Sequence, residues 1–151
     1  MQKEFIELLK KGIEELMPAN QLLGIKILEV KSGYAHLHVP FKNEFIGDFI
    51  QQRWHGGFLA AIADTAGGTA AATTLQSPKD KLNTIDMRID YLHAATSSDI
   101  EAKAQVIKDG KTIVKVDIQL FQDHQENPVV VARCVFSKLI KENSDKLSGK
   151  D

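Results

Sequence analysis

Residues 55–75 read HGGFLAAIADTAGGTAAATTL, a run of small and apolar residues with a single acid, Asp64, in its middle. Gly56 and Gly57 open the run, and its length predicts one helix that continues to about Leu75. An ionised carboxylate among apolar neighbours loses its hydration unless a nearby group compensates for the cost. Asp64 is therefore a candidate catalytic group, and the alternative is an acid that is satisfied by structural hydrogen bonds.

A stripe of very small side chains surrounds this acid on the predicted helix. The i, i+3, i+4, i+7 spacing of one helix face selects Gly57, Ala60, Ala61, Asp64, Gly67, Gly68 and Ala71. Each glycine costs about 1 kcal/mol of helix propensity relative to alanine, so the two paired glycines need a compensating benefit. We expect another backbone or a ligand to approach closely along this stripe, and the alternative is ordinary tight packing of the helix.

The start of the helix offers a second chemical group. The amide of Gly56 would lie at the helix N-terminus, where unpaired N–H groups and the helix dipole favour a developing oxyanion. Eight residues at about 1.5 Å rise separate Gly56 from Asp64 by roughly 12 Å, which is too far for both to serve one reacting centre. Two antiparallel helices related by a two-fold axis would bring Gly56 of one chain near Asp64 of the other. The spacing thus predicts a homodimer with two equivalent sites.

The residues before this helix predict a helix, a hairpin and a loop. Apolar residues recur at helical spacing over residues 5–17, with Lys and Glu between them, which predicts an amphipathic helix ended by Pro18. Residues 24–39 alternate in polarity around Ser32-Gly33 and predict two short strands. Residues 40–54 show no sustained period, so we interpret them as a loop.

Four strands are predicted after the helix. In the first, Ile85, Met87, Ile89 and Tyr91 alternate with Thr84 and other polar residues, as on a strand with one buried face. Polar connections separate the other three, which are predicted at Ile100–Ile107, Thr112–Phe121 and Val129–Leu139. Short hairpin connections favour a meander of these last four strands.

The order of these elements predicts an α+β fold. An antiparallel sheet must bury one face, and the long central helix is the only element apolar enough to cover it. We expect one domain over residues 1–140, with the amphipathic helix packed on it, and a charged, disordered tail over residues 141–151. The outer sheet face and an edge strand then favour self-association.

Composition excludes several classes of function. The 151 residues carry a formal net charge of −1 without a Lys/Arg cluster, which argues against a nucleic-acid partner. Cys134 is the only cysteine and the N-terminus lacks a signal-peptide pattern, so we expect a cytoplasmic protein without disulfides. The only stretch long enough to span a bilayer contains Asp64, so no membrane segment is predicted. His36 and His38 have metal-ligand spacing but no third ligand, so we predict no metal site.

The segment HGGFLAAIADTAGG, together with the later segment TIDMRIDYL, resembles the hotdog-fold acyl-CoA thioesterases of the phenylacetic-acid-degradation (PaaI-type) group. The resemblance covers roughly residues 24–139. It implies a hotdog fold, in which an antiparallel sheet wraps around a long central helix, and a dimer that is often paired into tetramers. It further implies hydrolysis of an acyl thioester of coenzyme A, with no metal or other cofactor.

The resemblance also implies roles for individual residues. The aspartate that matches Asp64 acts as general base or nucleophile, and the backbone amide that matches Gly56 polarises the thioester carbonyl. A hydroxyl at the position of Thr84 assists the attacking water in some members. His55 orients the turn at the start of the helix. Further candidates for substrate binding are Gly57, Gln52 and Trp54.

One position departs from the family's pattern. Many members carry an asparagine six residues before the motif histidine, where this chain has Phe49. Gln51 or Gln52 is near enough to take over that polar contact, unless the substrate does not need it. Trp54 either lines the substrate channel or fixes the loop. Two other functions stay open: a non-catalytic acyl-CoA or lipid-binding hotdog protein, and a hotdog dehydratase, for which no histidine paired with an acid is evident.

Overall fold

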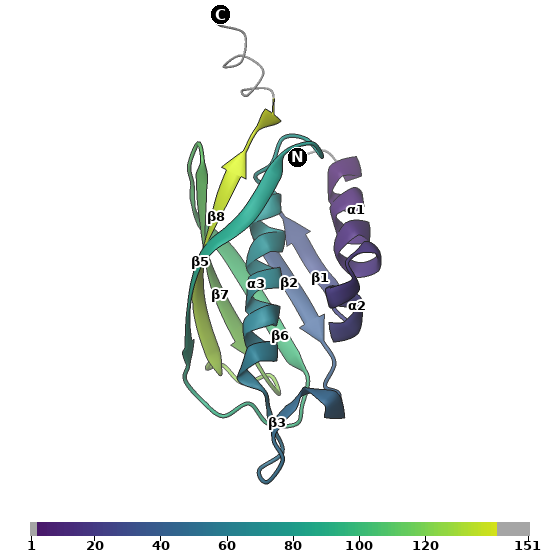
Figure 1. Cartoon of the computed structure of the whole chain (residues 1–151), viewed down its shortest axis with the longest axis vertical. Coiled ribbons are helices and arrows are strands. Elements are labelled where there is room, and N and C mark those ends of the chain that lie inside the picture. Colours follow the sequence, from purple (N-terminus) through teal and green to yellow (C-terminus); the bar gives the residue numbers. More distant parts are fainter. Residues whose placement is uncertain (1–2, 142–151) are drawn as a thin grey trace, which may run out of the picture.

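The computed structural model describes residues 3–141, and its N-terminal part is helical (Figure 1). Helix α1 (Lys3–Lys11) continues as a π-helical turn (Gly12–Leu16), and α2 spans Pro18–Leu23. The prediction that the first helix ends at Pro18 is confirmed, but the proline also begins a second helix that was not predicted. Proline suits the first helical position because its missing N–H would have no partner there.

Six antiparallel strands form one sheet in the order β1-β2-β6-β7-β8-β5. The strands are β1 (Lys26–Lys31), β2 (Tyr34–Val39), β5 (Lys81–Tyr91), β6 (Ile100–Asp109), β7 (Ile113–Phe121) and β8 (Val130–Leu139). All six were predicted, but the four-strand meander is wrong, because β5 pairs with β8 at the sheet edge and not with β6. The connection over residues 92–99 is longer than a tight hairpin turn and crosses the end of the sheet.

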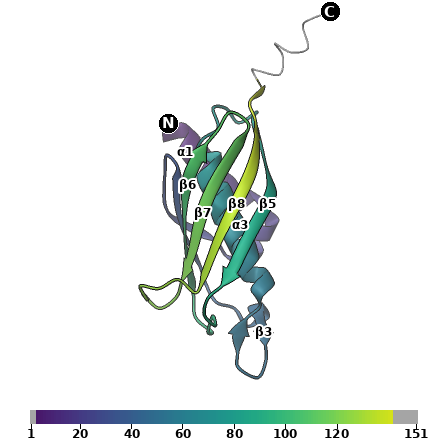
Figure 2. The same cartoon turned by 90° about the vertical axis from the view of Figure 1, so that its left-hand side faces the viewer.

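Helix α3 (Gly56–Ala72) lies along the inner face of the sheet, and α1 and α2 lie beside it near β1 (Figures 1 and 2). This confirms the predicted α+β arrangement of a sheet around one central helix. The helix ends three residues before the predicted Leu75. The hydroxyl of Thr73 donates to the carbonyl of Ala70 and accepts the N–H of Gly33, and such local bonds compete with further helix.

The predicted stripe of small residues is divided between two environments. Gly57 and Ala61 are exposed on the open face of α3, whereas Gly67 and Ala71 are buried against the sheet. A Cβ added at Gly67 would lie 3.1 Å from Cδ1 of Ile118, so this glycine serves close packing of helix on sheet. Only part of the stripe is therefore open to a partner or ligand.

A small hairpin replaces the loop that was predicted before α3. A 3-10 turn (Asn43–Phe45) leads into β3 (Ile46–Asp48), which pairs with β4 (Arg53–Trp54), and the hairpin projects from the end of the molecule where α3 begins (Figure 1). The aromatic rings of its base form a cluster: Phe45 stacks on Trp54 at 5.1 Å between centroids and contacts Phe58 of α3 at 4.9 Å. This cluster ties the hairpin to the start of the helix.

Two further predictions concern the C-terminal tail and a membrane-spanning segment. The predicted disordered tail over residues 141–151 falls, apart from Lys141, outside the described residues. Within residues 3–141, no helix is long and apolar enough to span a bilayer.

Candidate active site

Asp64 lies half-buried on α3 and is held by a hydroxyl from the edge strand. Thr84 of β5 donates a hydrogen bond from Oγ1 to Asp64 Oδ1 at 2.8 Å. The two residues are 20 positions apart in the chain, and the structure brings together a carboxylate and a hydroxyl that were predicted separately. Oδ1 is thereby fixed, and Oδ2 has no protein donor among residues 3–141.

A β-bulge in β5 makes this contact possible. Strict alternation predicted Thr84 on the face opposite to Met87, but the register shifts between Thr84 and Asp86. Thr84 therefore pairs with Phe136 while Met87 pairs with Cys134, so both of these β5 residues point toward α3, and Ile85 is left 56% exposed. The predicted burial of Ile85 was wrong, because the bulge reverses the phase of the alternation at that residue.

The N-terminus of α3 leaves one N–H group without an acceptor among the described residues. Gly57 N donates to Nδ1 of His55 at 2.9 Å, and the N–H groups of Phe58 and Leu59 donate to the His55 carbonyl at 3.1 and 3.4 Å. Of the first four N–H groups of the helix, only that of Gly56 has no acceptor within the part of the chain that the structure describes. This is the group that a negatively charged oxygen at the helix start would meet.

His55 is the N-cap of α3. Its Nδ1 accepts the N–H of Gly57, and this contact holds the ring in place over the first turn. The backbone N–H of His55 donates to the Phe45 carbonyl at 2.7 Å, which attaches the turn to the hairpin base. These contacts are those of a residue that orients the turn.

Tyr91 was predicted only as a strand residue, and it contacts the helix start directly. Its hydroxyl donates to the Gly56 carbonyl at 2.8 Å. The two residues lie 35 positions apart, and the only signal in the sequence is a phenol at the end of the inward-facing series of β5. Tyr91 thus holds the Gly56 peptide from the side of the sheet.

Trp54 and Gln52 make contacts that fix the hairpin. The indole of Trp54 is 5% exposed, and its Nε1–H donates to the Ser98 carbonyl at 2.9 Å. Of the two roles considered for Trp54, these contacts favour fixing the loop. The side-chain amide of Gln52 donates to the Phe49 carbonyl at 2.7 Å, within the hairpin tip. The side-chain amide of Gln52 therefore stabilises the turn. The side chain of Phe49 is exposed to solvent.

Cys134 lies behind the acid on the inner face of β8. Burial raises the pKa of its thiol to about 12, and the nearby negative charges of Asp64 and Asp86 add to this effect. The thiol stays protonated at neutral pH and packs as an apolar group, which confirms the prediction of a buried structural cysteine.

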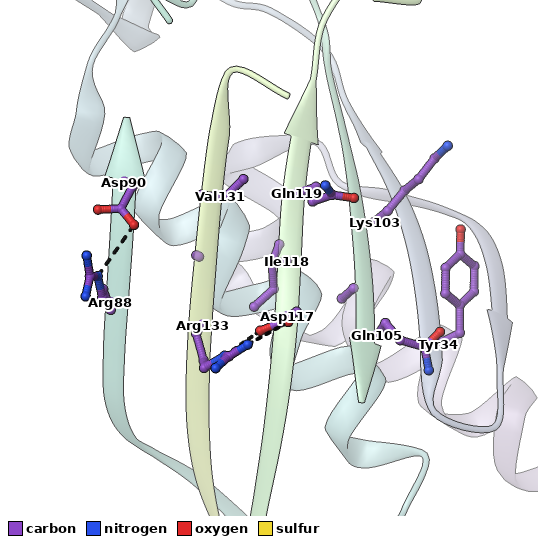
Figure 3. A pocket seen from close by; sticks show the side chains of 12 residues that line it. Tyr34, Arg88, Asp90, Lys103, Gln105, Asp117, Ile118, Gln119, Val131 and Arg133 are labelled. Atoms are coloured by element: carbon purple, nitrogen blue, oxygen red, sulfur yellow. Dashed lines mark hydrogen bonds and ion pairs between the residues drawn. The ribbon is translucent and has the colours of Figure 1, made fainter. Parts of the chain in front are cut away.

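Two hollows in the surface lie away from these residues. One, of about 640 Å³, lies on the outer sheet face, where Arg133 pairs with Asp117 and Arg88 with Asp90 (Figure 3). The other lies at the end of β6 and β7 and includes His38. Neither is lined by Asp64 or Gly56, so neither hollow of a single chain encloses the candidate groups.

His36 and His38 of β2 each contact a carboxylate. His36 Nε2 lies 2.9 Å from Glu101, and His38 Nε2 lies 2.9 Å from Asp99. Over residues 3–141, no group of three His, Cys, Asp or Glu side chains is placed to hold a metal ion.

Comparison with known proteins gives consistent matches. The family model of the thioesterase superfamily matches residues 51–129, which include His55, Asp64 and Thr84. The medium/long-chain acyl-CoA thioesterase YigI of Salmonella typhimurium is 23% identical over 82% of this chain and 86% of its own length. YigI of Escherichia coli K12 is 26% identical over 72% of this chain and 78% of its own.

Solved structures share the architecture. The PaaI protein of the Escherichia coli phenylacetic acid degradation operon superposes with a TM-score of 0.79, at 23% identity, over 92% of this chain and 96% of its own. At this identity the likeness concerns the fold, and it agrees with the hotdog arrangement of the sheet around α3.

Proposed function

Because the chain belongs to the thioesterase superfamily, we propose that it hydrolyses acyl-CoA thioesters to a free acid and coenzyme A. The observation that carries this proposal is the hydrogen bond from Thr84 to Asp64, which fixes a carboxylate beside the open face of α3. The N–H of Gly56 supplies the second group that the reaction requires. The names of the YigI relatives support acyl-CoA as the substrate class.

In the proposed reaction, the Gly56 N–H donates to the thioester carbonyl oxygen and stabilises the charge that develops on it. Asp64 takes a proton from a water molecule, and the water oxygen forms a bond to the carbonyl carbon. The C–S bond then breaks, and the sulfur of coenzyme A leaves with the proton that Asp64 held. Thr84 keeps the carboxylate oriented toward the water through Oδ1.

A direct attack by Asp64 is the second route through the same carboxylate. The carboxylate oxygen would bond to the acyl carbon as the C–S bond breaks, and water would then hydrolyse the resulting anhydride. A single turnover in water labelled with heavy oxygen separates the routes, because label that enters the Asp64 carboxylate identifies the anhydride.

The proposed site takes its groups from two chains. Gly56 and Asp64 belong to one continuous helix, and the rise of about 1.5 Å per residue sets them roughly 12 Å apart. The Gly56 N–H must lie within about 3 Å of the carbonyl oxygen, and Asp64 must reach the carbonyl carbon directly or through one water, which favours a donor and a carboxylate from different helices. We therefore propose that Gly56 of one subunit works with Asp64 of the facing subunit of a homodimer.

The proposed function is tested by thiol release from butyryl-, octanoyl-, lauroyl-, palmitoyl- and phenylacetyl-CoA. We expect turnover of at least one of these by the wild type, and a fall in kcat of about 10³-fold in Asp64→Asn. Asp86→Asn, which removes an exposed carboxylate that neighbours Thr84 in β5, is the matched control and should retain activity. Binding of acyl-CoA without turnover by the wild type would refute the enzyme and support the acyl-CoA-binding alternative.

The contacts of His55 within one chain do not favour the dehydratase alternative. That reaction needs a histidine that exchanges protons opposite an acid, whereas the side-chain hydrogen bond of His55 within residues 3–141 is to the Gly57 N–H and not to an acid. The same panel extended with a 3-hydroxyacyl-CoA checks this, since a dehydratase would form the unsaturated thioester and release no thiol.

A further inference from the structure

The tip of the β3–β4 hairpin carries two large apolar side chains in solvent. Phe49 is 81% exposed and Ile50 is 79% exposed, the highest values among the exposed large hydrophobic residues over residues 3–141. Figures 1 and 2 show the hairpin projecting beyond the rest of the molecule, at the end where α3 starts. Two adjacent side chains of this size are costly to keep in water unless something covers them when the protein works.

The exposure belongs to an ordered turn. The Asp48 carboxylate accepts the N–H groups of Ile50 and Gln51, both at 3.0 Å, and Gln52 closes the turn on the Phe49 carbonyl. The base of the hairpin is just as constrained, because a Cβ at Gly47 would lie 2.6 Å from the Cα of His55. The two side chains are thus presented by a fixed scaffold.

This scaffold is directly connected to the proposed oxyanion donor. Strand β4 (Arg53–Trp54) leads directly into His55, and the turn over residues 49–52, in which Gln52 has a φ of 55°, places the two side chains at the far end of the hairpin from the start of α3 (Figure 1). On the other side of Gly56, Tyr91 and Leu92 are about half exposed at the end of β5. Tyr91 contacts the Gly56 carbonyl, so apolar surface flanks the helix start on two sides.

We propose that Phe49 and Ile50 bind the acyl chain of the thioester and set the preference for its length, an inference that rests on the proposed function. The tip residues Phe49 to Gln52 carry no charge, which suits a hydrocarbon chain and not the phosphate groups of coenzyme A. By themselves, two side chains also bury far less surface than the area of about 800 Å² per partner that is typical of a stable protein interface. Because the hairpin projects beyond the start of α3, longer acyl chains contact the tip and short ones do not (Figure 1).

The test compares chain lengths in the double variant Phe49→Ala/Ile50→Ala. Each methylene that leaves an apolar contact costs about fourfold in binding, so the ratio of kcat/KM for palmitoyl-CoA to that for butyryl-CoA should fall about tenfold or more. Phe49→Leu/Ile50→Leu keeps the apolar tip and should keep most of the ratio. Leu139→Ala is the matched control, because its half-exposed side chain lies at the opposite end of the β5–β8 pair from Tyr91 and should leave the ratio unchanged.

Three results would overturn the inference. The first is an unchanged ratio, and the second is an equal loss of kcat/KM at every chain length, which would indicate a general effect on the turn. The third is a lower molar mass of the double variant in light scattering, which would indicate that the tip contacts another subunit. A wild type that turns over no acyl-CoA would instead refute the proposed function, and this inference with it.

Discussion

At Gly56, proline and alanine differ mainly in one N–H group. Both add a Cβ, which would lie 3.3 Å from the Tyr91 ring, but only proline removes the proposed oxyanion donor. The first helical position tolerates proline, and the extended backbone of His55, with φ −68° and ψ 128°, suits the residue before it. We expect Gly56→Pro to lower kcat by about 10²-fold or more, and Gly56→Ala by less than about tenfold.

Steady-state kinetics on the best acyl-CoA of the panel measure this difference. Thermal unfolding of both variants serves as the control, because crowding against Tyr91 affects the two alike. Equal losses of kcat in the proline and alanine variants would show that the N–H of Gly56 plays no special part.

Thr84 is a positioning residue in the proposed site, because its hydroxyl holds the carboxylate that acts on water. Thr84→Val keeps the shape of the side chain and removes the donor to Asp64 Oδ1. A hydrogen bond to a charged group contributes about 1.5–3 kcal/mol, so we expect kcat to fall by about 10- to 100-fold. Thr84→Ser restores the donor and should recover most of the activity. If valine and serine reduce kcat equally, the hydroxyl is not what matters at this position.

At the scale of elements, Gly47 joins the hairpin to the start of α3. A Cβ at this position would meet the His55 Cα at 2.6 Å, and backbone cannot move aside as a flexible side chain can. We expect Gly47→Ala to cost about 1–3 kcal/mol of unfolding free energy and to lower activity, since the His55-Gly56 turn must shift. Chemical denaturation and the hydrolysis assay measure the two effects.

Gly12→Ala is the matched control for this prediction. Among residues 3–141, nothing lies within 4 Å of a Cβ at Gly12, so the same substitution there should be neutral or stabilising. A Gly47→Ala variant as stable and active as Gly12→Ala would disprove the close coupling of hairpin and turn.

The regular elements could be predicted from the sequence because their periodicity is local. Residues 56–72 combine small and apolar side chains over several turns, and the strands alternate as half-buried strands do. The β3–β4 hairpin was not predicted because its residues show no periodicity. Its ordered turn depends on side chains such as Asp48, which accepts backbone N–H groups of the turn. Sequence pattern carries little information on contacts of this kind.

The strand order and the bulge in β5 could not be predicted from local sequence pattern, for another reason. Which strand lies beside β5 depends on the path of residues 92–99 across the sheet end, which is a property of the whole fold. The bulge is seen only against the register of β8, yet it decides whether Thr84 faces Asp64. The family resemblance suggested a role for Thr84, whereas alternation alone would have placed this residue on the face of the sheet away from Asp64.

At the scale of the whole molecule, the proposed chemistry requires a second chain. In one chain, Gly57 and Ala61 leave an open face on α3, and β5 leaves an unpaired sheet edge beside Thr84. A two-fold axis beside this edge would place the helices antiparallel and build two equivalent sites. Dimerisation and catalysis would then depend on the same surface.

Complementation between two variants of strongly reduced activity tests this proposal. Asp64→Asn keeps its Gly56 donor and lacks the carboxylate, whereas Gly56→Pro keeps the carboxylate and lacks the donor. In a shared site, a heterodimer holds one intact site and one that lacks both groups. After denaturation and refolding of an equal mixture, about half of the dimers are mixed, so activity should return to about a quarter of the wild-type value per chain.

The two variants refolded separately are the control, and each should keep its own low activity because every site in a homodimer lacks the same group. Titrating the ratio of the two chains at constant total protein sharpens the test. Activity of a shared site follows the product of the two mole fractions and peaks at an equal mixture. If mixing restores no activity at any ratio while light scattering shows mixed dimers, Gly56 and Asp64 do not meet across the interface, and the two-chain site is wrong.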